Sequence, residues 1–148
     1  MRTKLKILLT GGLGFIGKRF IKKFSYDYDI IVFDRKEAVA NGKDSSQFKN
    51  IIFEKGSIED KKVFDVVTKH KPDIIIHLAA LTGLTRCDDS PQKAFRVNVS
   101  GTQNVLDACA KTGSKFIFIS SREVYGETKG NKSNRGKTTT TNRKSFTK

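Results

Sequence analysis

Cysteine and long apolar runs are both scarce in this sequence of 148 residues. The two cysteines, Cys87 and Cys109, lie in no CxxC pair and have no histidine at metal-ligand spacing, so we expect two reduced thiols and no metal site. No stretch approaches the roughly 18 uninterrupted apolar residues of a membrane-spanning helix. The first residues run directly into a β-like segment and lack the features of a signal peptide. These observations argue against a disulfide scaffold and favour a cytoplasmic protein with no membrane partner.

Acidic residues are few compared with basic ones. The chain has 29 Lys and Arg against 15 Asp and Glu, and residues 127–148 alone contain seven basic residues and one acidic residue. This excess favours anionic ligands and could hold nucleic acid weakly. A dedicated nucleic-acid module should also show a recognisable motif or interleaved aromatics, and the sequence has neither, so nucleic acid is not an expected partner.

The C-terminal 22 residues differ in composition from the rest of the chain. Phe146 is the one large apolar side chain among them, and Thr138–Thr141 is a threonine run. Such a segment buries too little apolar surface to offset its ordering entropy. We therefore expect one folded domain over residues 1–126 and a disordered basic tail over residues 127–148.

Short apolar runs alternate with segments of helical periodicity over the first 120 residues. Strands are expected at residues 5–10, 30–34, 51–53, 74–78 and 116–120, and helices at residues 14–24, 57–70 and 90–112. Ser57 with Asp60 resembles a capping box, Ser90-Pro91 is a typical helix start, and residues 35–49 read as loop. Alternating strands and helices with short links predict an α/β fold, a Rossmann-type doubly wound parallel sheet with strand order 3-2-1-4-5.

A glycine-rich segment, Gly11-Gly12-Leu13-Gly14-Phe15-Ile16-Gly17, follows the first strand and opens the first helix. In this context Gly11 allows a tight turn, Gly14 lets the backbone approach a pyrophosphate, and Gly17 lets the helix pack close to the sheet. The free N–H groups of the helix N-terminus favour phosphates. The segment therefore predicts a dinucleotide-binding loop.

Asp34 ends the second strand, 20 residues after Gly14. A carboxylate in this position can accept both adenosine-ribose hydroxyls and repels a 2′-phosphate, which favours NAD over NADP. Arg35 and Lys36 follow directly and could instead hold that phosphate, so NADP stays an alternative.

Four motifs in order resemble the extended short-chain dehydrogenase/reductase family of NAD-dependent sugar-nucleotide epimerases and dehydratases. They are the TGxxGxxG loop from Thr10, the run His77-Leu78-Ala79-Ala80, Asn98 within a helix, and the run Ser120-Ser121-Arg122-Glu123-Val124-Tyr125-Gly126. The resemblance covers residues 5–126 and implies the N-terminal portion of such an enzyme, with a nucleotide sugar as substrate if the chain is completed. Family members commonly dimerise through paired helices, and helix 90–112 could serve here.

The resemblance also implies roles for individual residues. Ser121 matches the catalytic Ser/Thr of the family, and Glu123 takes the position of a base in some dehydratases and decarboxylases. Ile58 would pack on the adenine, which Ser57 could contact with one hydrogen bond. The predicted cofactor-binding residues are Gly11, Gly14, Phe15, Ile16, Gly17, Asp34, Arg35, Ser57, Ile58, Leu78, Ala79, Ala80 and Asn98.

Two departures from the family pattern leave the function open. Ser57 stands where the family usually has Asp, so it could be a helix cap only. The catalytic YxxxK motif is missing from its expected position, from about residue 146 onward, where the sequence reads Ser145-Phe146-Thr147-Lys148. Hydride transfer to NAD from a nucleotide-sugar carbon is one hypothesis, and a non-catalytic dinucleotide-binding module or truncated gene product is the alternative.

The two histidines are not expected to be catalytic. His77 lies in a strand that we expect to be buried, so we predict that it is a core imidazole with satisfied hydrogen bonds. His70 lies near a helix C-terminus, where the helix dipole favours its charged form.

Overall fold

A five-stranded parallel sheet forms the centre of the computed structural model, which describes residues 4–36 and 51–121. The strands lie in the order β3-β2-β1-β4-β5, as the sequence predicts. Ile, Leu, Val and Phe occupy most positions of the three inner strands, which suits a sheet covered on both faces. The strands are β1 (Lys6–Thr10), β2 (Asp29–Asp34), β3 (Ile51–Lys55), β4 (Ile74–His77) and β5 (Lys115–Phe118).

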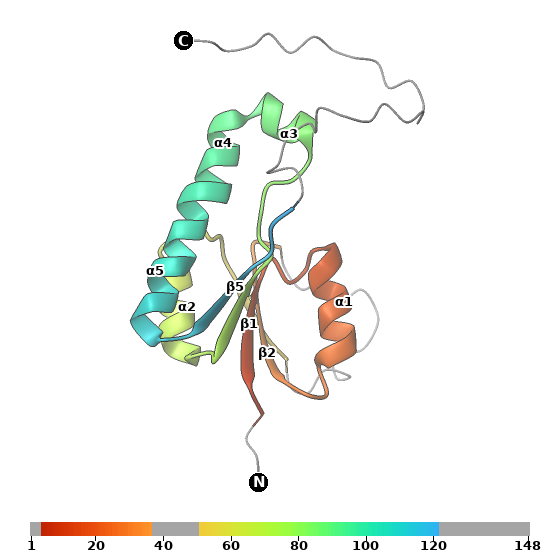
Figure 1. The fold of residues 1–148 in the computed structure, drawn as a ribbon, viewed down its shortest axis with the longest axis vertical. Coiled ribbons are helices and arrows are strands. Elements are labelled where there is room, and N and C mark those ends of the chain that lie inside the picture. Colours follow the sequence, from red (N-terminus) through yellow and green to blue (C-terminus); the bar gives the residue numbers. More distant parts are fainter. Residues whose placement is uncertain (1–3, 37–50, 122–148) are drawn as a thin grey trace, which may run out of the picture.

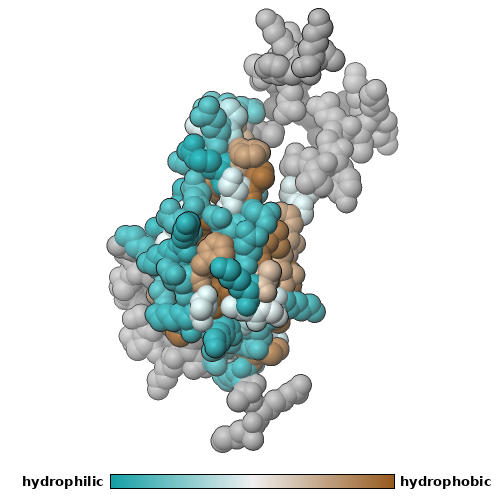
Figure 2. Space-filling view, turned by 90° about the vertical axis from the view of Figure 1, so that its left-hand side faces the viewer, coloured by the Kyte–Doolittle hydropathy of each residue, from teal (hydrophilic) through white to brown (hydrophobic). Residues whose placement is uncertain are grey.

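Helices cover the two faces of this sheet unequally. Helix α1 (Phe15–Phe24) lies on one face, and α2 (Lys62–His70) and α5 (Thr102–Thr112) lie on the other (Figure 1). Helix α5 continues the π-helical turn η2 (Arg96–Gly101), which follows α4 (Pro91–Phe95) and the short α3 (Leu84–Asp89). Seen from the α2 and α5 side, the surface is mainly hydrophilic (Figure 2).

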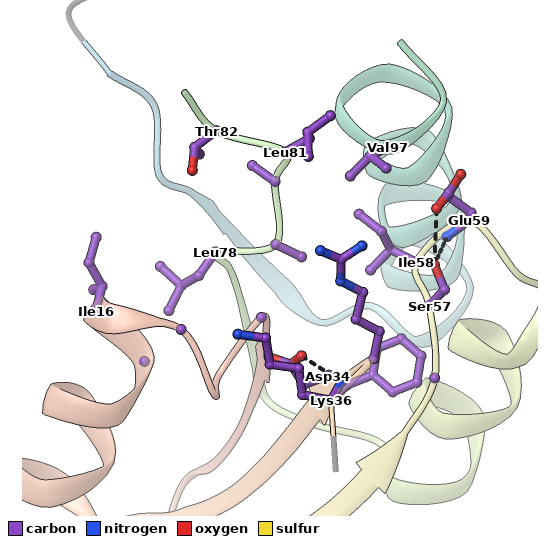
Figure 3. A pocket seen from close by; sticks show the side chains of 18 of the residues that line it. Ile16, Asp34, Lys36, Ser57, Ile58, Glu59, Leu78, Leu81, Thr82 and Val97 are labelled. Atoms are coloured by element: carbon purple, nitrogen blue, oxygen red, sulfur yellow. Dashed lines mark hydrogen bonds between the residues drawn. The ribbon is translucent and has the colours of Figure 1, made fainter. Parts of the chain in front are cut away.

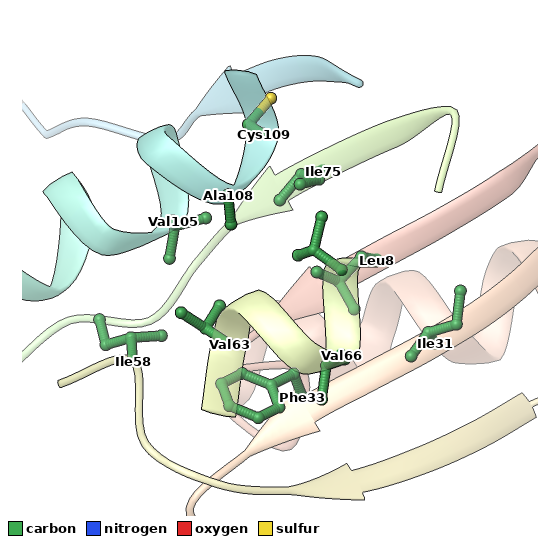
Figure 4. Packing of buried hydrophobic residues seen from close by; sticks show 11 residues of the cluster. Leu8, Ile31, Phe33, Ile58, Val63, Val66, Ile75, Val105, Ala108 and Cys109 are labelled. Atoms are coloured by element: carbon green, nitrogen blue, oxygen red, sulfur yellow. The ribbon is translucent and has the colours of Figure 1, made fainter. Parts of the chain in front are cut away.

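The larger hydrophobic core lies between the sheet and the α2–α5 pair. Leu8, Phe33 and Ile75 project from three strands onto Val63 of α2 and Val105 of α5, all nearly inaccessible to solvent (Figure 4). Cys109 is buried in the same cluster, and burial raises the pKa of its thiol. A second, smaller core under α1 contains Ile7, Leu9, Ile21, Ile30 and Val32.

The predicted start of the second helix is wrong by five residues, because α2 begins at Lys62. Ser57 does not cap this helix. Its Oγ accepts a hydrogen bond from the N–H of Glu59 at 3.2 Å, and its carbonyl accepts one from the N–H of Asp60 at 3.1 Å. The Ser57 hydroxyl thus closes a local turn, a use of serine that competes with helix capping.

The predicted helix over residues 90–112 exists but is not uniform. Pro91 takes its first position, and it ends before Gly113, whose φ of +69° favours glycine. The Ser90 side chain makes no capping hydrogen bond, and the six residues of η2 interrupt the α-helical pattern. Helix α3 was not expected, because its six residues are too few to show a clear period.

Several predictions fall on parts of the chain that the structure does not describe. They are the greater part of the loop at 35–49, the role of Glu123, and the tail at 127–148. Within the described residues, no helix is long and apolar enough to cross a membrane. The same residues contain no cluster of His, Cys, Asp and Glu that could hold a metal ion.

Candidate functional site

A cavity of about 440 Å³ opens at the carboxyl ends of the strands, where the strand order reverses between β1 and β4. This is the position in which doubly wound sheets bind ligands. In Figure 3, Ile16 and Leu78 lie on one side of the cavity, Ser57 and Ile58 on the other, and Asp34 between them. Of the predicted cofactor-binding residues, the cavity is lined by Gly11, Gly14, Phe15, Ile16, Gly17, Asp34, Arg35, Ser57, Ile58, Leu78, Ala79 and Ala80.

Close backbone contacts explain two of the loop glycines. Gly11 has a φ of +69°, and a Cβ there would lie 2.7 Å from the backbone N and Cα of Ala79. A Cβ at Gly17 would lie 2.3 Å from the carbonyl oxygen of Gly12. A side chain at either position would therefore separate segments that form the cavity wall.

Among residues 4–36 and 51–121, the first N–H groups of α1 have no hydrogen-bond partner. Gly14, at the N-cap, has no side chain to donate or accept, and the first turn contains no acidic residue. Lys18 makes the first helical bond, to the Gly14 carbonyl at 3.1 Å, so the N–H groups of Phe15, Ile16 and Gly17 lack intrahelical acceptors. An uncapped helix start of this kind binds anions.

The apolar side chains of α1 are divided between the cavity and the core. Phe15 and Ile16 are 73% and 55% exposed and line the cavity, whereas Ile21 packs into the core. The Arg19 guanidinium lies 3.5 Å from the centroid of the Phe15 ring. The first helical turn thus belongs to the site, and the core-facing stripe begins one turn later.

Asp34 is held in place by two backbone N–H groups. Its Oδ2 accepts from Leu13 of the glycine loop and its Oδ1 from Lys36, both at 3.0 Å. Each carboxylate oxygen can accept a further hydrogen bond. The exposed side chains of Arg35 and Lys36 line the same cavity, so both an acid and two cations are available to a ribose or its phosphate.

The wall at Ser57 and Ile58 is fixed by a residue that the sequence analysis missed. Asn104 of α5 donates through Nδ2 to the carbonyl of Ile58 at 2.9 Å and to that of Glu59 at 3.3 Å. Ile58 is buried and would also contact a Cβ at Gly101. A lone asparagine in a helix gives no sequence signal of such a long-range contact.

Asn98 supports the opposite wall from behind and is not itself among the residues lining the cavity. Its Oδ1 accepts from the N–H of Leu81 at 2.8 Å, and its Nδ2 donates to the Leu81 carbonyl at 3.0 Å. The structure therefore gives it a positioning role. Lys36, named above for the NADP alternative, also lines the cavity. Further lining residues that were not predicted are Phe33, Gly56, Glu59, Leu81, Thr82, Arg86 and Val97.

The candidate catalytic residues are not brought into this cavity by the described part of the chain. Ser121 is exposed, lies three residues after β5, and is not among the lining residues. Glu123 lies outside the described residues. Their roles stay predictions.

The two histidines differ in their surroundings. His77 is 2% exposed, with both ring nitrogens hydrogen-bonded, which confirms the expectation of a satisfied core imidazole. His70 lies 2.7 Å through Nε2 from Glu54, which also pairs with Lys69. These two partners lower the pKa of the Glu54 carboxyl, with the Lys69 hydrogen bond as the largest cause.

Comparison with known proteins agrees with this geometry. Residues 7–146 match the profile of the NAD dependent epimerase/dehydratase family. The chain belongs to this family. It is 38% identical over 130 residues to the CDP-paratose 2-epimerase of Salmonella typhi, and 37% identical over 130 residues to the dTDP-D-glucose 4,6-dehydratase of Dictyostelium discoideum. These matches cover 83% and 82% of this chain but 38% and 30% of the two relatives.

Solved structures of the family show the same fold. The UDP-Glc/GlcNAc 4-epimerase of Campylobacter jejuni superposes with a TM-score of 0.76 at 30% identity, over 85% of this chain and 40% of that one. The UDP-glucose 4-epimerase of Brucella ovis, solved in complex with NAD, gives 0.70 at 33% identity, over 83% and 38% of the two chains. The chain thus spans about two-fifths or less of the relatives it matches.

Proposed function

We propose that this chain binds NAD as the N-terminal cofactor-binding part of an epimerase or dehydratase that acts on nucleotide sugars. The observation that carries the proposal is that the uncapped N-terminus of α1 and the carboxylate of Asp34 line one cavity. A dinucleotide needs these two groups together, one for its diphosphate and one for its ribose hydroxyls. The NAD complex of a relative with 33% identity supports it.

The residues present fit this cofactor. The N–H groups of Phe15, Ile16 and Gly17 can hold the diphosphate, and Asp34 can accept from the adenosine ribose while it keeps its bonds to Leu13 and Lys36. Ile58 offers an apolar contact for the adenine. Bound NAD would accept a hydride from a carbon of the sugar, and Ser121 and Glu123 would act on the oxygen and a proton of that sugar.

Isothermal titration calorimetry of the 148-residue chain with NAD tests the proposal. We expect saturable binding with one site per chain, and much weaker binding of NADP. An absence of NAD binding by a folded protein contradicts the proposal. Binding of NADP alone would assign the site to Arg35 and Lys36 in place of Asp34.

A second titration, with a nucleotide sugar, distinguishes the cofactor-binding part of an enzyme from a non-catalytic binding module. Family membership favours recognition of a nucleotide sugar, whereas a non-catalytic module binds NAD only.

We expect no turnover by this chain, because no tyrosine and lysine pair occupies the family position near residue 146. Tyr125 and Lys129 have the YxxxK spacing but come soon after Ser121. If NAD reduction is observed, a Tyr125→Phe variant shows whether this pair causes it.

A further inference from the structure

A hydrogen-bonded series of polar side chains runs from Thr10 of β1 through His77 of β4 to the half-buried Thr102 of α5. His77 Nδ1 lies 2.6 Å from Thr10 Oγ1, and His77 Nε2 lies 3.0 Å from Thr102 Oγ1. Thr10 is inaccessible to solvent, and His77 is 2% exposed. Thr10 and His77 are opposite each other in the β1–β4 register, so neighbouring strands place their side chains together on one face of the sheet.

The hydroxyl protons decide the tautomer of the ring. Thr102 donates its single hydroxyl proton to the carbonyl of Asn98 at 2.8 Å, so its oxygen must accept from His77, whose Nε2 therefore carries the ring proton. His77 Nδ1 is then an acceptor, and Thr10 donates to it. The oxygen of Thr10 also accepts from the N–H of Ala79 at 3.4 Å. In this arrangement each of the hydroxyl protons of Thr10 and Thr102 and the ring proton of His77 has an acceptor.

The opposite tautomer leaves one buried proton unmatched. If Nδ1 carried the ring proton, Thr10 would accept from both His77 and Ala79. Its own hydroxyl proton would then have no other acceptor within hydrogen-bond distance in the described part of the chain. An unsatisfied buried donor is costly, and the Nε2–H form avoids that cost.

Both ends of this hydrogen-bonded chain hold residues of the cavity wall. Thr10 precedes Gly11 of the phosphate loop and bonds to the N–H of Ala79. At the other end Thr102 bonds to the backbone of Asn98, whose side chain holds both backbone groups of Leu81. His77 thus ties the start of the loop, the segment after β4 and the helix that supports it.

We propose that His77, as the neutral Nε2–H tautomer between Thr10 and Thr102, is a positioning residue for the dinucleotide site. The proposal rests on the proposed NAD binding. His77 does not line the cavity, so it acts through the two threonines on Gly11, Ala79 and Leu81. Correct spacing of these segments is what lets one ligand contact the loop and the opposite wall together.

The surroundings of the ring favour its neutral form. Phe116 and Phe118 of β5 stand beside it, with ring centroids 5.8 Å and 5.9 Å away. Thr10 of β1 and Thr102 of α5 complete the contacts, and none of these four side chains is charged. Burial lowers the pKa of His77 to about 4.

A long-range ¹H–¹⁵N spectrum of the folded chain tests the tautomer without any ligand. We expect His77 to show a protonated Nε2 and an unprotonated Nδ1 at neutral pH. Assignment of the proton to Nδ1, or a mixture of the two tautomers, overturns the proposed proton arrangement.

Calorimetry with NAD tests the positioning role through two isosteric variants. Thr10→Val and Thr102→Val remove one hydroxyl each and leave the cavity lining unchanged. Each should weaken NAD binding by about tenfold, which is the upper end of the range expected for the loss of one hydrogen bond. His77→Phe should weaken it at least as much, whereas His77→Gln, which keeps a donor toward Thr102, should recover part of the loss.

Val67→Ala is the matched control. Val67 is fully buried in α2, outside the cavity, so its truncation lowers stability without touching the hydrogen-bonded chain. All titrations are run well below each variant's unfolding temperature. Unchanged NAD affinity in both threonine variants, or an equal loss in Val67→Ala, overturns the positioning role. Failure of the unaltered chain to bind NAD overturns the proposed function, while the ring spectrum still decides the proton arrangement.

Discussion

At the residue scale, the site depends on atoms that are missing as much as on those present. A side chain at Gly11 would separate the loop from Ala79, and a side chain at Gly17 would push the start of α1 away from Gly12. Asp34 contributes one charge, already oriented by two N–H groups before any ligand binds. Such preorganisation reduces the ordering cost that a ligand has to overcome.

Gly17→Ala should weaken NAD binding by at least tenfold and lower the free energy of unfolding by about 1–3 kcal/mol, because its Cβ would lie 2.3 Å from the Gly12 carbonyl. The start of α1 would have to move away from the loop. Calorimetry and urea unfolding measure the two effects. Gly113→Ala is the control, since its positive φ costs stability in open space far from the cavity. Equal NAD affinities in the two variants would contradict the explanation.

Asp34→Asn should weaken NAD binding by about tenfold and raise the preference for NADP, because the amide no longer repels a 2′-phosphate beside Arg35 and Lys36. The ratio of the two dissociation constants is the measurement. Asp65→Asn makes the same change of charge on the exposed side of α2 and should leave that ratio unaltered. A shift of equal size in both variants would show a general charge effect.

Stability should fall as the pH is lowered from about 6.5 to about 4, because the pKa of His77 drops from 6.5 when unfolded to about 4 when folded. Between these pH values His77 is protonated in the unfolded chain but not in the folded chain. The stabilising contribution of neutral His77, which is complete above pH 6.5, is therefore lost as the pH falls to about 4. The full difference is about 3 kcal/mol. Glu54, whose pKa is lowered, adds a loss at still lower pH, as the pH falls through its folded pKa. Urea unfolding across this range measures the slope, which His77→Gln should flatten; an equally steep slope in that variant would assign it to other groups.

At the element scale, one helical segment supports both walls of the cavity. Asn98 in η2 binds Leu81, and Asn104 in α5 binds Ile58 and Glu59. These bonds connect the helix to loops 17 or more residues away in sequence. The wall segments are thus fixed to a rigid helix, which suits a site that must keep its shape.

Asn98→Ala should lower the free energy of unfolding by about 2 kcal/mol, because it leaves the N–H of Leu81 without its partner and the Leu81 carbonyl with only the weak Cys87 thiol donor. NAD affinity should fall as well, since Leu81 lines the cavity. Thermal unfolding and calorimetry provide the readouts. Gln103→Ala on the same helix loses a surface contact with Asp107 only and should leave both values nearly unchanged. A similar loss of stability and NAD affinity in the two variants would refute the supporting role of the Asn98–Leu81 hydrogen bonds.

At the scale of the whole molecule, the sheet has helices on both faces but uneven cover. Phe118 and Ile119 at and just after the end of β5, and Phe95 and Val99 along α4 and η2, are large apolar side chains with more than two-fifths of their surface exposed. A homodimer through residues 90–112, as the family resemblance implies, would cover part of this surface and stays a prediction. The family match covers residues 7–146, and the match to one relative covers 38% of that relative, so the described elements correspond to an N-terminal portion of the family's chains.

NAD should stabilise the whole fold, because a ligand that binds only the folded state shifts unfolding by mass action. At 100 times the dissociation constant the gain is about 2.7 kcal/mol, which corresponds to a rise in the unfolding temperature of about 5–10 °C for this chain length. Differential scanning calorimetry with NAD measures the rise, and nicotinamide alone, which lacks the diphosphate, serves as the control. No rise with NAD at saturation would contradict binding to the folded chain.

The local pattern of the sequence was enough for the sheet order, the glycine loop and the acid at the end of β2, since periodicity and fixed spacing determine them. It was not enough at Ser57, where a hydroxyl that suits a helix cap closes a turn.

Which residues support the site was decided only by tertiary structure. Asn98, Asn104 and the Thr10–His77–Thr102 chain join segments up to 67 residues apart. Their hydrogen bonds exist because strand register and helix packing bring distant groups within reach, and no local spacing in the sequence encodes such a distance.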